Sequence, residues 1–375
     1  MINPDKYITN LAEHGINFFT GVPDSLLKQI CACISHKMSP NNHIIAANEG
    51  AAIGLGIGHH LGSNTIPFIY LQNSGLGNTV NPILSLSSPE VYGIPMIIMV
   101  GWRGEPNVKD EPQHVHQGRV MIDLFDSMDI PYFVLDKNEE TAIQQTNEAI
   151  NLAKEKATPV FLAVQKNTFE DFQTDNQNHE LALSREDAIK IAAQNTPNNA
   201  VIVATTGMAS RELFEYRADM NQEHNRDFLT VGGMGHASQI ALGLSISQPS
   251  RSIYCFDGDG AAIMHMGSMA IIGQSQAIKL IHLVFNNAAH DSVGGQPTVG
   301  MDVDFCSIAD ACGYITSKTV STENDLKDVL IARQSQDGPH FIEVLVRKGN
   351  RDSIGRPTRS PLENKNDIMN FIKNT

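Results

Sequence analysis

Two short polar motifs follow apolar segments in the second half of the chain. Residues 257–261 (DGDGA) come directly after SIYCF, and Asn286-Asn287 come directly after KLIHLVF. The glycines beside Asp259 let a phosphate approach the backbone closely, and the start of the helix that follows favours an anion. Carboxylate and amide oxygens suit Mg²⁺, which is held by few protein ligands together with phosphate and water. The motifs together predict a site for magnesium and a diphosphate, with a turn carrying a capping Asp as the alternative.

Short apolar runs alternate with helical patterns in both halves of the chain. The runs are INFFTGV, NHIIAAN, TIPFIYLQ, IPMIIMVGW, IPYFVLD and TPVFLAVQ, then AVIVATTG, DFLTVGG, SIYCFDGDG, KLIHLVFNN, YITSKTV and HFIEVLV. Helices are predicted between them, for example at 24–37, 49–62 and 138–156. This alternation is typical of an α/β protein in which helices cover both faces of a mostly parallel sheet. Ligands bind beyond the carboxyl ends of such strands, where both motifs lie.

A polar stretch at 169–180 interrupts this alternation. A chain of 375 residues suits two domains, and we predict a domain at 1–168, a linker at 169–183 and a domain at 184–375. The second domain is expected to begin with a helix, because Ser184-Arg-Glu-Asp is typical of a capping box. The two halves are expected to be similar in fold, although no sequence repeat relates them.

Composition excludes several classes of protein. The formal net charge of −14 argues against binding of nucleic acid or of an anionic membrane, which both require clustered positive charge. No run approaches the ~20 apolar residues that span a bilayer, and the opening residues lack the pattern of a signal peptide. The cysteines have spacings that fit neither a zinc site nor a disulfide framework. They are Cys31, Cys33, Cys255, Cys306 and Cys312. We expect a cytoplasmic protein with reduced cysteines.

The spacing of GDG and NN on successive strands resembles the motif of thiamine diphosphate (ThDP) enzymes. The resemblance implies two ThDP-binding-fold domains, a pyrimidine-binding domain at 1–168 and a diphosphate-binding domain at 184–375, with no middle domain. It implies that Asp259, the Asn287 side chain and the Ala289 carbonyl bind Mg²⁺. The residues expected to contact ThDP are Thr206, Gly207, Met234, Gly258, Gly260, Ala261 and Asn286. Met234 is expected to hold the cofactor in a bent form, with a core methionine as the alternative.

Glu49 stands after an apolar run and before a helix of small residues, in IIAAN-Glu49-GAAIGLGIG. By resemblance it hydrogen-bonds the aminopyrimidine ring of ThDP and thereby activates the cofactor. Taken alone, Glu49 is equally readable as an acid in the first turn of a helix, where the helix dipole favours negative charge. Its pairing with the downstream motif favours the catalytic role.

The absence of a middle domain and the run 286–298 (NNAAHDSVGGQPT) resemble the phosphonopyruvate decarboxylase family. The resemblance implies a small anionic 2-keto acid as substrate, namely 3-phosphonopyruvate, which would be decarboxylated to phosphonoacetaldehyde in phosphonate biosynthesis. A sulfopyruvate decarboxylase and a catalytically silent regulatory subunit are the alternatives. The family also implies a homodimer or larger homo-oligomer with each active site between subunits.

The segment 101–119 contains several cationic side chains that a phosphonate or sulfonate would favour, although an exposed loop is an equal alternative. Ser25, Arg103 and His290 are the predicted substrate contacts. Asp24, His114 and His116 are predicted to handle protonation and product release, from their positions in loops after strands.

Overall fold

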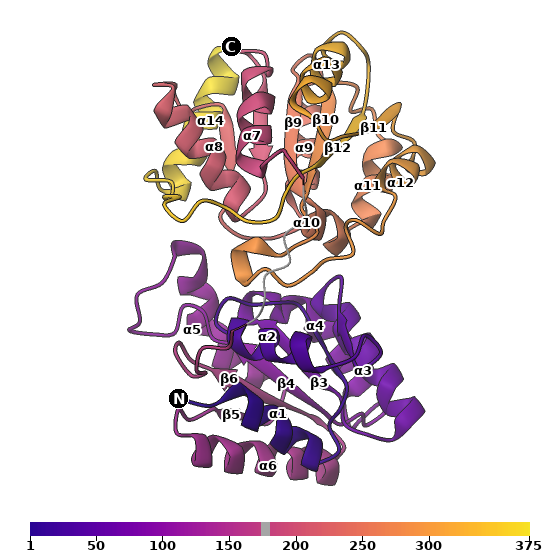
Figure 1. The fold of residues 1–375 in the computed structure, drawn as a ribbon, viewed down its shortest axis with the longest axis vertical. Helices are drawn as coiled ribbons and strands as arrows, with labels where there is room; N and C mark the ends of the chain where they lie inside the picture. Colours follow the sequence, from indigo (N-terminus) through magenta and orange to yellow (C-terminus); the bar gives the residue numbers. More distant parts are fainter. Residues whose placement is uncertain (174–180) are drawn as a thin grey trace. The chain divides into compact units, whose positions relative to one another are not determined.

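The computed structural model describes residues 1–173 and 181–375 and divides the chain into two compact units, Met1–Asn176 and Gln177–Thr375 (Figure 1). Each unit is an α/β layer structure built on its own parallel sheet. Each of the runs predicted as strands contains one strand of these sheets. The α/β prediction, with helices on both faces, is confirmed.

The first unit has a six-stranded sheet in the order β2-β1-β3-β4-β6-β5. Its strands are β1 (Phe19–Gly21), β2 (His43–Ile45), β3 (Phe68–Gln72), β4 (Met96–Gly101), β5 (Tyr132–Val134) and β6 (Pro159–Val164). Its helices are α1 (Pro4–Glu13), α2 (Lys28–Lys37), α3 (Glu49–Ser63), α4 (Leu76–Pro82), α5 (Pro112–Ser127) and α6 (Glu139–Lys156). All the strand pairs are parallel.

Alternate residues of one strand supply two different cores in the first unit. In β4, Ile97 and Met99 pack with α1, α2 and α6, whereas Ile98 and Val100 pack with α3, α4 and α5. Successive side chains of a strand point to opposite faces of the sheet, so a strand covered on both faces must be apolar throughout. This explains why its sequence shows a continuous apolar run.

The second unit has a six-stranded parallel sheet in the order β11-β12-β10-β9-β7-β8. Its strands are β7 (Val201–Ala204), β8 (Asp227–Leu229), β9 (Ile253–Gly258), β10 (Leu280–Asn286), β11 (Thr316–Val320) and β12 (His340–Leu345). Its helices are α7 (Arg185–Gln194), α8 (Met208–Asp219), α9 (Ala237–Ser247), α10 (Asp259–Met264), α11 (Gly267–Gly273), α12 (Phe305–Cys312), α13 (Glu323–Gln334) and α14 (Pro361–Asn374).

The two sheets have the same strand order. When the strands of each unit are numbered from that unit's own first strand, both sheets read second, first, third, fourth, sixth, fifth. In both sheets, the second strand lies on one side of the first strand, whereas the fourth strand lies on the opposite side of the third. Such a reversal opens a crevice at the carboxyl ends of the two strands. The crevice is expected between β1 and β3 in the first unit, and between β7 and β9 in the second.

Local capping follows the sequence, with one correction. Asn138 caps α6 and Ser184 caps α7, each by accepting a backbone N–H bond with its side chain. The helix predicted at 24–37 begins only at Lys28. Asp24 accounts for the later start, because its Oδ2 accepts the Leu26 N–H at 3.0 Å and holds the chain in a turn. None of the helices in the described ranges is long and apolar enough to cross a membrane.

Candidate functional site

The turn after β9 is closely covered by two predicted site residues. A Cβ at Gly260 would lie 2.8 Å from Cε1 of His290 and 3.4 Å from Cε of Met234. Glycine is therefore required at this position by the close approach of both side chains. A Cβ at Gly258 would meet nothing within 4 Å, so the backbone on this side of Asp259 remains open. The structure brings Met234 and His290 to the predicted diphosphate turn.

Asp259, the first residue of α10, is only 2 % exposed. Its Oδ2 accepts a hydrogen bond from the Thr298 hydroxyl, and backbone amides contribute further bonds. Burial raises the pKa of Asp259 to about 6, because desolvation outweighs these neutral donors. A buried carboxylate whose hydrogen-bond partners are neutral gains most from a cation, and Mg²⁺ prefers such oxygen ligands. The site therefore fits a divalent cation.

The two asparagines after β10 have different environments. Asn286 donates to the Gly300 carbonyl at 2.8 Å and to Oε1 of Glu343 at 2.7 Å. Both hydrogens of its amide nitrogen are therefore bonded to neighbouring protein groups. Asn287 donates through Nδ2 to Oδ2 of Asp291 at 2.6 Å. Its Oδ1 accepts the Ala289 N–H at 3.1 Å and keeps a second lone pair for another partner. Oδ1 of Asn286 likewise accepts the Ala288 N–H at 3.1 Å, so each asparagine keeps an oxygen lone pair, and the choice of Asn287 as the metal ligand stays a prediction.

The loop after β7 meets the loop after β10. Gly207 adopts φ +93°, and a Cβ there would lie 3.2 Å from Cβ of Ser292. The half-buried Thr206 precedes it at the start of α8. The loops of β7 and β9 border the crevice that the strand order opens, and the loop of β10 adjoins it. The predicted diphosphate residues thus gather at one end of this sheet.

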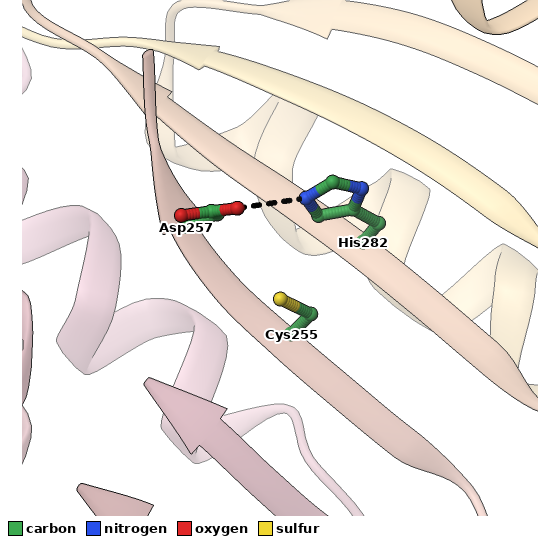
Figure 2. A group of neighbouring side chains, drawn as sticks. All are labelled: Cys255, Asp257 and His282. Carbon is green, nitrogen blue, oxygen red and sulfur yellow. Dashed lines mark hydrogen bonds and ion pairs between the residues drawn. The ribbon is translucent and has the colours of Figure 1, made fainter. Parts of the chain in front are cut away.

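A buried group of Cys255, Asp257 and His282 precedes the diphosphate turn (Figure 2). One potential ligand atom from each lies within 4.8 Å of the others. Nε2 of His282 lies 3.4 Å from Oδ2 of Asp257, and its Nδ1 lies 3.1 Å from the Tyr314 hydroxyl. Oδ1 of Asp257 accepts the Gly258 N–H at 3.0 Å, and burial raises the pKa of the Cys255 thiol. These bonds indicate that the three residues have a structural role, in which they hold the turn in place. They do not favour a second metal site.

In the first unit, Glu49 begins α3 and is 6 % exposed. Its Oε2 accepts a bond from Nδ2 of Asn78 at 2.7 Å. A Cβ at Gly75 would lie 2.2 Å from Oε1 of Glu49, so the chain after β3 encloses the carboxyl group. Oε2 is thereby held, while Oε1 is the oxygen that remains for another partner.

We expect Gly75→Ala to displace the Glu49 carboxyl group, because the added methyl cannot coexist with Oε1 in its present position. Turnover should fall at least tenfold, with a drop in melting temperature. Gly62→Ala in the same helix as Glu49 is the matched control, since a Cβ there meets nothing within 4 Å. The measurements are steady-state kinetics and thermal unfolding, and equal behaviour of the two variants would contradict the packing described.

Arg103, which follows β4, is bound on three sides. Its Nε donates to Oδ2 of Asp110 at 2.8 Å, its second terminal nitrogen donates to the other oxygen of Asp110, and NH1 donates to the Ser25 hydroxyl at 2.7 Å. The Asn73 amide holds the Arg103 carbonyl at 2.7 Å. Arg103 and Ser25, both predicted substrate contacts, are therefore adjacent. Asp110 accepts bonds from Nε and NH2 of the guanidinium. NH1 of Arg103 is therefore the nitrogen that reaches Ser25 and that a ligand beside Ser25 would contact.

Asp24 lies beside this cluster and is fully buried. A Cβ at Gly101 would lie 2.1 Å from its Oδ2, so the end of β4 packs directly on the carboxyl group. Burial raises the pKa of Asp24 to about 6, although the Arg103 charge acts in the opposite direction. Its Oδ1 has no hydrogen-bond partner in the parts of the chain that the structure describes. A buried polar atom of this kind marks a position where a ligand or water is favourable.

The two histidines of α5 have different positions. Burial lowers the pKa of His114 to about 4, and Arg103 adds to the effect, so His114 is neutral near pH 7. Its buried Nδ1 lacks a partner within residues 1–173 and 181–375. His116 is exposed, and Arg119 donates to its Nδ1 at 2.7 Å. Residues two apart on a helix face different directions, so only His114 lies with the Arg103 cluster.

We expect Asp24→Asn to stabilise the cofactor-free protein near neutral pH. Burial raises the pKa of Asp24 to about 6, so the folded protein binds the Asp24 proton more tightly than the unfolded chain does. The protonated side chain therefore contributes its full stabilisation below about pH 4, and this contribution is lost as the pH rises through 6. Asparagine has no charged form, so the variant should gain on the order of 2 kcal/mol near pH 7.5 and almost nothing near pH 4. Urea unfolding at these two pH values measures the difference.

Asp123→Asn, on the exposed side of α5, is the control for this substitution and should change stability little at either pH. A decrease in the stability of Asp24→Asn near pH 7.5 would contradict the cost assigned to the buried charge.

Several residues of the site were not predicted. Thr298, Asn78, Gly75 and Asp110 each contact a predicted residue, and Gln296 is a buried amide with no partner for either polar atom among the described residues. Gly75 and Asn78 stand in the helical segments that follow β3, Asp110 lies in the segment 101–119, and Gln296 and Thr298 lie in the run 286–298. Their positions beyond strand ends were visible in the sequence, but their individual partners were not.

Comparison with known proteins identifies the class. The model described as "Thiamine pyrophosphate enzyme, N-terminal TPP binding domain" matches residues 6–128, and its C-terminal counterpart matches residues 205–344. Thiamine pyrophosphate is another name for ThDP. The first match lies within the first unit and the second within the second unit. The chain thus contains the two cofactor-binding domains of a ThDP enzyme.

Curated relatives narrow the class. The phosphonopyruvate decarboxylase of Streptomyces viridochromogenes is 32% identical over 99% of this chain and 95% of the relative. That of Streptomyces hygroscopicus is 32% identical over 97% of this chain and 92% of the relative. The sulfopyruvate decarboxylase of Methanosarcina acetivorans is 23% identical over 95% of both chains. The chain belongs to the phosphonopyruvate decarboxylase family and is a ThDP-dependent carboxy-lyase of 2-keto acids.

Proposed function

We propose that this enzyme decarboxylates 3-phosphonopyruvate to phosphonoacetaldehyde and CO₂, with ThDP and Mg²⁺, as a step in phosphonate biosynthesis. The observation that carries the proposal is the 32% identity, over almost the whole length of both chains, to two proteins named phosphonopyruvate decarboxylase. Sulfopyruvate is the second candidate substrate, because a sulfopyruvate decarboxylase also matches over 95% of its length.

In the proposed site, Asp259, Asn287 and the Ala289 carbonyl hold Mg²⁺. The backbone at Gly258, Gly260 and the start of α10 would contact the diphosphate, with further contacts from the loop of Thr206 and Gly207. Support comes from the burial of the Asp259 carboxylate among neutral donors and from the free lone pair of the Asn287 oxygen. A divalent cation bound there would remove the electrostatic cost of that buried charge.

When bound, ThDP supplies the electron sink that a 2-keto acid needs in order to lose CO₂. Glu49 is proposed to share a proton with the cofactor ring through Oε1, because Asn78 already holds Oε2. Asp24, with a pKa of about 6, is suited to deliver a proton and recover it near neutral pH. His114 is neutral near pH 7, because its pKa is about 4, and could act as a hydrogen-bond donor or acceptor there.

The anionic group of the substrate is proposed to bind the NH1 edge of Arg103 and the Ser25 hydroxyl. These two groups are adjacent, and Asp110 fixes the orientation of the guanidinium. A charge-assisted bond to one side of an arginine would favour a phosphonate or sulfonate over the methyl group of pyruvate. His290 is proposed to contact the substrate from the second unit. We also propose a homodimer or larger homo-oligomer, in which Glu49 of one chain and Asp259 of another serve the same active site.

Release of CO₂ from phosphonopyruvate, sulfopyruvate and pyruvate tests the substrate. We expect kcat/KM for phosphonopyruvate to exceed that for pyruvate by about a hundredfold, corresponding to roughly 3 kcal/mol from contacts with the anionic group. Activity should disappear after removal of ThDP and divalent metal and return only when both are added. A preference for sulfopyruvate would replace the proposed substrate with the second candidate, and activity without ThDP would contradict the proposed use of the cofactor.

Glu49→Gln should lower kcat by about 10²- to 10⁴-fold, the usual contribution of a group that transfers protons. The neutral amide keeps the size of the side chain and its contact with Asn78. Binding of Mg²⁺ and ThDP, followed by calorimetry, should therefore persist. The exposed Glu13 in α1 provides the control, and Glu13→Gln should keep full activity. Full turnover in Glu49→Gln would discard the proposed role of this carboxylate.

A further inference from the structure

The predicted metal ligand Asn287 is oriented by a carboxylate. A carboxylate only accepts hydrogen bonds, so the amide nitrogen of Asn287 must face Asp291, and the 2.6 Å bond from Nδ2 to Oδ2 meets this requirement. The amide oxygen is thereby directed away from Asp291. Rotation of the amide by half a turn would place its oxygen against the carboxylate oxygen. Asp291 consequently selects one of the two orientations of the Asn287 side chain.

Asp291 is itself held by buried Arg185. NH1 of Arg185 donates to Oδ2 of Asp291 at 2.8 Å, and the two side chains are 8% and 6% exposed. The same oxygen also accepts the Gly349 N–H at 3.1 Å. Three donors from three separate segments of the chain therefore meet on one carboxylate oxygen. This oxygen has little freedom to move, so the bond that orients Asn287 is fixed in space.

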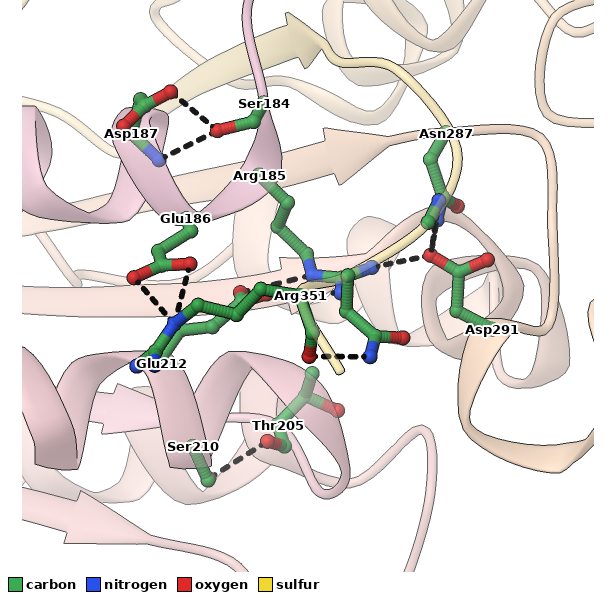
Figure 3. Close-up of polar contacts among 12 residues, drawn as sticks. Ser184, Arg185, Glu186, Asp187, Thr205, Ser210, Glu212, Asn287, Asp291 and Arg351 are labelled. Carbon is green, nitrogen blue, oxygen red and sulfur yellow. Dashed lines mark hydrogen bonds and ion pairs between the residues drawn. The ribbon is translucent and has the colours of Figure 1, made fainter. Parts of the chain in front are cut away.

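Glu212 in α8 completes the network (Figure 3). Nε and NH2 of Arg185 donate to its two oxygens at 2.9 and 3.0 Å, a bidentate arrangement in which the Glu212 side chain is 1% exposed. Glu212 thus holds the fork of the guanidinium and leaves NH1 for Asp291. The network connects α7, α8 and the loop after β10 in a single line of charged groups that ends at Asn287.

We propose that Arg185 and Asp291 are positioning residues for the Mg²⁺ ligand Asn287, and that they set both the affinity and the selectivity of the metal site. The inference rests on the proposed metal site. Groups that hydrogen-bond a metal ligand fix its orientation and strengthen it as a donor, and their loss commonly weakens binding about 10- to 100-fold. Mg²⁺ requires near-ideal octahedral geometry, whereas Ca²⁺ accepts looser shells. A firmly oriented Asn287 should therefore favour Mg²⁺ over Ca²⁺.

Asp291→Asn tests the inference by calorimetric titration of Mg²⁺, and separately of Ca²⁺, into metal-free protein with excess ThDP. We expect the Mg²⁺ dissociation constant to rise about tenfold or more. The Ca²⁺ constant should rise less, so the preference for Mg²⁺ should fall. Arg185→Lys keeps the charge but loses the fork, and it should shift both constants in the same directions. If the Asp291 variant does not fold, the Arg185 variant decides the question.

Asp227→Asn is the matched control for general destabilisation. Asp227 forms a comparable buried pair with Arg217 at 2.8 Å, in the same unit but at the start of the edge strand β8. This variant should lose stability and retain the wild-type preference for Mg²⁺. Wild-type metal constants in Asp291→Asn, or equal changes in selectivity in both variants, would overturn the inference.

Asp259→Asn separates this inference from the proposed function. It removes the charge of the predicted principal ligand and should weaken Mg²⁺ binding more than any variant of the network. Unchanged Mg²⁺ binding in Asp259→Asn would refute the metal site itself. A large loss in Asp259→Asn without any effect in Asp291→Asn would leave the metal site in place and refute only the positioning role.

Discussion

Burial of carboxylates at the ends of parallel strands is the constraint on which both candidate sites depend. Asp24, Glu49 and Asp259 are each almost completely removed from solvent. Each also packs against a glycine that leaves no room for a side chain. A Cβ would lie 2.1 Å from Oδ2 of Asp24 at Gly101, 2.2 Å from Oε1 of Glu49 at Gly75, and 2.5 Å from Oδ2 of Asp259 at Gly300. For Asp24 and Asp259, burial of this kind raises the pKa, which suits the two groups to exchange a proton or accept a cation.

The two units share one strand order but carry different side chains in the loops after their strands. In the first unit, the loops after β1, β3 and β4 bring together an acid, an arginine and polar amides. In the second, the loops after β7, β9 and β10 bring together a buried acid, an asparagine and glycines. The reversal of strand order makes the same region available in both units. The two regions therefore differ mainly in the identity of a few loop residues.

An arginine supports each of the two sites in a similar way. Arg103 gives its fork to Asp110 and its NH1 to Ser25, whereas Arg185 gives its fork to Glu212 and its NH1 to Asp291. In both cases one carboxylate fixes the guanidinium, and the remaining edge reaches a residue of the site. This arrangement explains how the two guanidinium groups can be buried, because each is paired with carboxylates in a fixed direction.

The sequence by itself determined the strands found in the described residues, the α/β character of both halves, the start of a helix after Ser184, and the ThDP motif. These features depend on apolar runs, glycines and capping residues that act over a few neighbouring positions. The tertiary structure decided which polar groups meet, since Asn78 and Glu49 are 29 residues apart and Arg185 and Asp291 are 106 apart. It also placed His114 and His116 on different sides of α5. The turn at Asp24 made α2 begin later than its sequence pattern predicts. Partner choice depends on the placement of whole strands and helices, and local sequence does not contain that information.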